Sequence, residues 1–127
     1  MKIASTIARY LLGVVFTVFG LNGFLQFLHM PPPTGMAAQF MGALFVSHYA
    51  LFVFLVQFAA GLLLLANRYV PLALLLLGPV IVNILLFHLF MAPSGLPLAL
   101  VVTILWALVF ASVRSAFAGI FQQRVKA

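Results

Sequence analysis

One stretch of the sequence, residues 71–91, restricts the fold more than any other. It reads PLALLLLGPVIVNILLFHLFM and is apolar apart from Asn83 and His88. At 1.5 Å of rise per residue, a helix of this length crosses the roughly 30 Å hydrocarbon core of a bilayer. We therefore expect a membrane-crossing helix whose two polar side chains need hydrogen-bond partners.

The composition agrees with this expectation and excludes a soluble globular chain. Of the 127 residues, 67% are hydrophobic and 5% are charged, whereas soluble domains carry about 25% charged residues. Three further apolar segments, residues 10–30, 49–66 and 96–117, are long enough to cross a membrane. The sequence predicts one all-α domain over residues 1–127, an integral membrane four-helix bundle.

The first two spans are joined by residues 31–47. This segment begins with three prolines, which remove amide donors and end the first helix. The apolar run after them is too short to span a bilayer, so we predict a short interfacial or re-entrant helix that caps the bundle. Asn67, Arg68 and Tyr69 predict a tight turn before Pro71, which suits the first turn of the third span.

The charges predict the orientation. The chain has six Lys or Arg and no Asp or Glu, a net charge of +6. With four spans, all six basic residues fall on one side of the membrane, which predicts cytoplasmic termini. Attraction to anionic lipids accounts for the charge, and the scattered bases do not indicate nucleic-acid binding. The basic residues are Lys2, Arg9, Arg68, Arg114, Arg124 and Lys126.

The missing residue types exclude several chemistries. Without cysteine there is no thiol or Fe–S chemistry from this chain, and without carboxylates there is no paired-acid hydrolysis. No metal site is expected, because His29, His48 and His88 lack helical ligand spacing and a carboxylate partner. A haem held by two of these histidines is the less favoured alternative, and the roles of His29 and His48 stay open.

The remaining polar side chains gather in the outer half of the predicted bundle. Asn22, Gln26 and His29 have the spacing of one helical stripe. Gln57, near the middle of the second span, is the expected partner of Asn83. A polar cluster inside an apolar bundle is typical of a small-molecule pocket, with residues 31–47 as a lid. We predict ligand-binding roles for Asn83, His88, Gln57, Asn22 and Gln26, and assign no catalytic residue. The alternative is that these side chains only tie helices together.

Two stretches carry a resemblance to a known family. They are GLNGFLQFLHMPPP and GLLLLANRYVPLALLLLGPVIVNILLFHLF, and together with the four-span layout they resemble the DoxX family of small bacterial inner-membrane proteins. The resemblance covers nearly the whole chain. Members of this family often carry an acidic residue where this chain has Gln57. The matching positions are Asn22, Arg68, Pro71, Pro79, Asn83 and His88.

The resemblance implies a location in the bacterial inner membrane and a link to oxidoreductases. Some members belong to a thiosulfate:quinone oxidoreductase, and others to membrane complexes that respond to oxidative stress. We therefore expect a quinone-linked or oxidoreductase-associated membrane subunit, with quinone as the leading ligand. Its expected partners are the lipid bilayer and either further copies or oxidoreductase subunits. The alternative is a non-catalytic accessory or scaffold protein, and the sequence leaves open whether it is an enzyme. Transport is disfavoured by the missing carboxylates.

Overall fold

The computed structural model describes residues 2–125 and contains helices but no strand in that range. Its four long helices are α1 (Lys2–Leu25), α3 (Tyr49–Ala66), α4 (Val70–Phe90) and α5 (Leu96–Val113). The shorter helix α2 (Gly35–Val46) lies between α1 and α3. Two short 3₁₀ turns, η1 (Pro93–Gly95) and η2 (Arg114–Phe117), come before and after α5. The predicted all-α architecture is confirmed, and four helices are long and apolar enough to cross a membrane.

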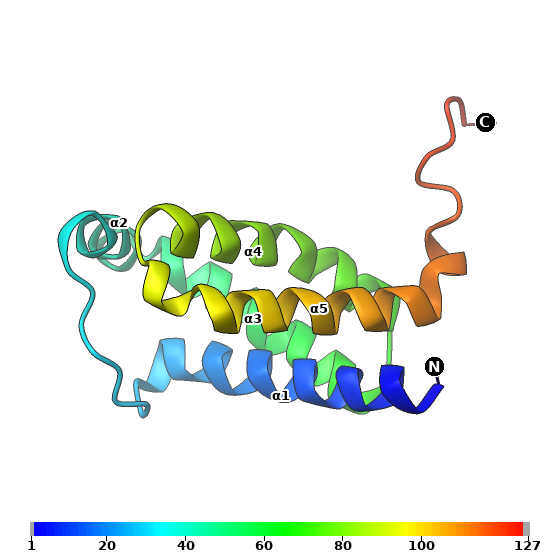
Figure 1. Cartoon of the computed structure of the whole chain (residues 1–127), viewed down its shortest axis with the longest axis horizontal. Helices are drawn as coiled ribbons and strands as arrows, with labels where there is room; N and C mark the ends of the chain where they lie inside the picture. The colour runs from blue at the N-terminus through cyan, green and yellow to red at the C-terminus, as the bar shows by residue number, and fades with distance from the viewer. Residues whose placement is uncertain (1, 126–127) are drawn as a thin grey trace.

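Successive long helices run in opposite directions along the length of the bundle (Figure 1). α1 packs against α3 and α5, and α4 packs against the same two helices, so α1 and α4 lie diagonally opposite. The shared core is mostly aliphatic and includes Phe16. Its fully buried large side chains are Leu12, Leu64, Leu74, Leu77 and Val109. Burial of such side chains is the main interaction between these helices within the bundle.

The pair α1 and α3 is held at close range by glycines. A methyl group at Gly20 would lie 2.6 Å from the backbone nitrogen of Phe58, and one at Gly61 would lie 2.5 Å from that of Thr17. Real side chains cannot occupy these positions without moving a helix. Small residues that let two backbones approach are a common basis of helix association in membranes.

The first helix differs from the predicted span of residues 10–30. It begins at Lys2. In its first turn, the hydroxyl of Thr6 donates a hydrogen bond to the carbonyl of Lys2 at 2.8 Å. It ends at Leu25, because Gln26 has a left-handed φ of 50° and the amide of Leu28 donates to Oδ1 of Asn22. The predicted stripe of Asn22, Gln26 and His29 is therefore wrong, since His29 lies beyond the helix.

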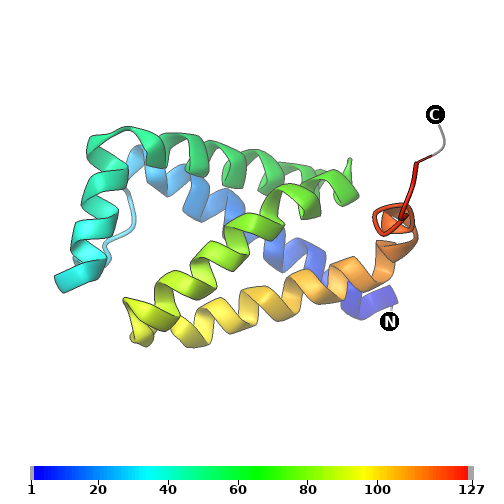
Figure 2. The same ribbon diagram turned by 90° about the horizontal axis from the view of Figure 1, so that it is seen from above.

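The tight turn predicted at residues 67–69 is present. Asn67 and Tyr69 have left-handed φ values of 54° and 52°. The amide of Arg68 donates to the carbonyl of Leu63 at 3.0 Å, and that of Asn67 donates to Leu64 at 3.2 Å, which is the Schellman pattern of a helix end. From this turn α3 and α4 diverge (Figure 2).

The helix α2 lies across the end of the bundle opposite the N-terminus (Figures 1 and 2). It is attached by aromatic contacts, with ring centroids 5.7 Å apart for Phe40 and Phe87 and 5.8 Å apart for Phe45 and Phe54. Because these partners belong to α4 and α3, α2 bridges the two helices where they have diverged.

The last predicted span, residues 96–117, is divided in the structure. The α-helix ends at Val113 and continues as the 3₁₀ turn η2. Residues 118–125 then form turns and irregular chain that leave the bundle (Figure 1).

Candidate functional site

Asn83 lies on the outward side of α4. The surrounding positions Leu75, Pro79, Val82 and Leu86 are also exposed and follow the three- and four-residue spacing of one helix face. The Asn83 side chain donates from Nδ2 to the carbonyl of Pro79, one turn earlier, at 2.8 Å. The predicted bond between Asn83 and Gln57 is therefore absent, and the only hydrogen bond of the Asn83 carboxamide in residues 2–125 is within its own helix.

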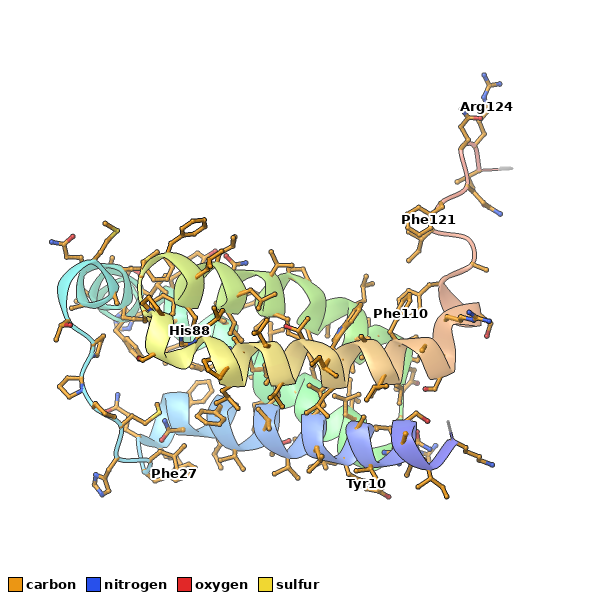
Figure 3. All side chains as sticks on the ribbon, viewed as in Figure 1. Tyr10, Phe27, His88, Phe110, Phe121 and Arg124 are labelled. Atoms are coloured by element: carbon orange, nitrogen blue, oxygen red, sulfur yellow. The ribbon has the colours of Figure 1, made fainter. Side chains whose placement is uncertain are left out.

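His88 is half-buried and folds back onto the turn after α4. Its Nδ1 lies 3.1 Å from the carbonyl oxygen of Ala92, and its ring meets that of Phe87 edge-on with centroids 5.1 Å apart. The imidazole packs directly over Gly95, where a Cβ atom would overlap the ring. In this position His88 orders the connection between α4 and α5 (Figure 3).

Gln57 faces the inside of the bundle from α3 and is 8% exposed. Its carboxamide forms no hydrogen bond with another residue of the described part of the chain. The hydroxyl of Thr17 on α1 is also buried and has no partner within residues 2–125. Buried polar groups are normally hydrogen-bonded, and among the fully buried side-chain polar atoms of residues 2–125 the Thr17 hydroxyl oxygen is the one that lacks a partner.

Asn22 lies in the last turn of α1, and Gln26 directly follows the end of the helix at Leu25. The oxygen of the Asn22 side chain accepts the amide of Leu28 at 2.8 Å, and the backbone of Gln26 donates to the carbonyl of Asn22 at 2.8 Å. Asn22 is half-buried, whereas the Gln26 side chain is exposed. Asn22 therefore stabilises the chain that follows α1, a role that its position in the sequence did not predict.

The five predicted residues are thus spread over different surroundings. Asn83 points outward, Gln57 points inward, and Asn22 and His88 bond to nearby backbone. Their joint role as ligand-binding residues stays a prediction. His29 and His48 are exposed, and within residues 2–125 no three His, Cys, Asp or Glu side chains come together as metal ligands would.

Within residues 2–125, two side chains without a predicted site role form hydrogen bonds to distant parts of the chain. The indole N–H of Trp106 on α5 donates to the carbonyl of Leu74 on α4 at 3.0 Å. The guanidinium of Arg9 on α1 donates to the carbonyl of Leu64 near the end of α3. In the sequence, Arg9 contributed only to the predicted orientation. Sequence spacing within one helix carries no signal for either bond.

Comparison of the chain with family models, with curated protein sequences and with solved structures finds no match.

Proposed function

We propose that this protein is a DoxX-like, multi-pass accessory subunit of the bacterial inner membrane that binds another membrane protein through α4. One observation carries the proposal, the outward carboxamide of Asn83 in the middle of an apolar helix face. Both termini are cytoplasmic, and α2 lies at the outer membrane surface or re-enters from it.

The depth of Asn83 makes its exposure costly. It precedes the end of α4 at Phe90 by seven residues, a distance of about 10 Å along the helix, and so falls within the hydrocarbon core. Its one internal bond leaves an N–H and an oxygen lone pair facing lipid tails. A fully unpaired amide costs about 4–8 kcal/mol to transfer to hydrocarbon, and the groups of Asn83 that stay unpaired bear part of this cost.

A helix from another protein removes this cost. Hydrogen bonds between membrane helices contribute about 0.6–2 kcal/mol, and an asparagine offers both a donor and an acceptor. The flanking exposed side chains, Leu75, Val82 and Leu86, are aliphatic and suit packing against a second helix. The partner is a further copy of this chain or a subunit of a membrane oxidoreductase.

The size of the assembly after gentle extraction tests the proposal. We expect native mass spectrometry to find the protein in a complex, and Asn83→Leu to release it as a monomer. Gln39→Leu is the matched control, since it removes an exposed carboxamide from α2 and should leave the complex intact. A wild-type protein that is always monomeric contradicts the proposal.

A second candidate function, binding of a quinone or similar lipophilic ligand, is supported by Gln57. Gln57 is 8% exposed and its carboxamide makes no hydrogen bond within residues 2–125, so its N–H groups are available to a carbonyl of a bound ligand. In the same mass spectra, a monomer that retains a quinone, and loses it in Gln57→Met, would support this candidate over the accessory subunit.

A further inference from the structure

The end of the bundle that carries the N-terminus contains a polar recess of about 180 Å³. It lies between the start of α1, the turn after α3 and the end of α5, segments that meet at this end (Figure 1). Its polar lining comes from Ser5, Thr6, Arg9, Asn67 and Ser112. None of the predicted ligand-binding residues takes part in it.

Arg9 gives this recess a charge that the chain does not neutralise. Its guanidinium donates to the carbonyl of Leu64 and lies 4.4 Å from the ring centre of Tyr10. A guanidinium has five N–H donors and stays charged, so a single neutral carbonyl leaves most of its capacity free. Because the sequence contains no Asp or Glu, no side chain of the protein can act as a counter-ion for Arg9.

Among the neighbouring side chains, the carboxamide of Asn67 is the donor that suits an oxyanion. Ser5 is 8% exposed although it lines the recess, and its hydroxyl donates to the carbonyl of Lys2 at 3.1 Å. The hydroxyl of Ser112 donates to Val109 at 2.6 Å. These hydroxyls are held by their own helices, so the first donors to an anion are the guanidinium of Arg9 and the carboxamide of Asn67.

The surroundings favour a phosphate. Arg68 lies in the turn between α3 and α4, and Arg114 is the first residue of η2, at the same end of the bundle. Their charges raise the local concentration of anions. The recess, at about 180 Å³, far exceeds the roughly 10–15 Å³ that a cavity needs to admit one water. Charge-assisted bonds from a guanidinium to a phosphate are among the strong hydrogen bonds in proteins.

We infer that this recess, around Arg9, binds one phosphate group at the cytoplasmic surface, supplied by the headgroup of an anionic lipid or by free phosphate. This site is separate from the Asn83 face, and only its position on the cytoplasmic side rests on the orientation given in the proposed function. Its failure would leave the association through α4 untouched.

Native mass spectrometry of the full chain tests the site with three probes: phosphatidylglycerol, phosphatidylcholine and inorganic phosphate. We expect phosphatidylglycerol to bind about tenfold or more tightly than phosphatidylcholine, and Arg9→Gln to abolish that preference. Arg68→Gln is the matched control, because it removes an exposed charge at the same end, outside the recess, and should keep most of the preference.

The outcomes separate the two sources. Binding of phosphatidylglycerol that inorganic phosphate does not displace identifies a lipid headgroup, and displacement by phosphate identifies a free anion. Equal losses in Arg9→Gln and Arg68→Gln would overturn the site in favour of general charge attraction. Binding of neither anion would overturn it as well.

A second pair of variants covers the case in which Arg9→Gln does not fold. Ser112→Leu places an apolar side chain in the recess, whereas Ala111→Leu adds the same side chain at an exposed position beside it. We expect Ser112→Leu to lose phosphatidylglycerol selectively and Ala111→Leu to keep it. Equal retention by both variants overturns the proposal.

Discussion

Gly20 of α1 lies directly against the backbone of Phe58 in α3, so that a methyl group there would be 2.6 Å from the Phe58 nitrogen and 3.0 Å from the Phe54 oxygen. Both obstacles are main-chain atoms, which cannot rotate away. The close approach of α1 and α3 therefore depends on this glycine.

Replacing Gly20 with alanine should destabilise the bundle by about 1–3 kcal/mol, the usual cost of overpacking. The melting temperature in detergent measures the effect. Gly42→Ala is the control, since nothing lies within 4 Å of a methyl group there and alanine favours a helix interior by about 0.5–1 kcal/mol. Equal stability of the two variants would contradict the packing described here.

Trp106→Phe should lower the stability by about 0.5–1.5 kcal/mol, because it removes the N–H that bonds to the carbonyl of Leu74 while keeping an aromatic ring. The ring stack with Phe110, 5.2 Å between centroids, can persist. Thr103→Ala removes a bond from the same helix to its own Ala99 carbonyl and should change the melting temperature less. The reverse order would show that the bond from Trp106 does not join α4 to α5.

Gln57→Met distinguishes the two candidate functions. In the accessory-subunit account, removing an unpaired buried carboxamide stabilises the ligand-free protein by about 1 kcal/mol, and added quinone has no effect. Thermal unfolding with and without ubiquinone measures both quantities. Quinone that stabilises the wild type but not Gln57→Met would favour the ligand-binding function. Gln39→Met, at an exposed position, controls for the loss of a carboxamide.

The predicted orientation can be measured directly because the chain has no cysteine. Single cysteines at the exposed positions Ser47 and Ser115 give one probe at each end of the bundle. A membrane-impermeant maleimide should label Ser47→Cys in intact cells and Ser115→Cys only after permeabilisation. The opposite labelling would place the termini outside.

The sequence was sufficient for the helices but not for their lateral contacts. Hydropathy predicted the spans, and the turn at Asn67 followed from local residue preferences. The end of α1 was misplaced, because the side chain of Asn22 caps the backbone of Leu28, a contact that hydropathy does not register. The directions of Asn83 and Gln57 were not predictable, because α4 and α3 are apolar on all sides and lack a polar face that would orient them.

The same limit explains the candidate site. Residues that share a depth in the membrane were expected to share a pocket, yet Asn83 faces outward and Gln57 inward. Arg9 was assigned only to topology, and its bond to Leu64 joins residues 55 positions apart in sequence. The depth of a residue in the membrane follows from its position in the sequence, whereas the direction of its side chain depends on how the helices pack.

The most direct test of the account is cross-linking at the Asn83 face in living cells. A photoreactive amino acid at Leu86, which is exposed one turn from Asn83, should cross-link to a second copy or to another membrane protein. The cross-link should be lost in the Asn83→Leu background and should not form from Leu98, an exposed position on α5. A cross-link at Leu86 that is unchanged by Asn83→Leu, or its absence in the wild type, would contradict the account.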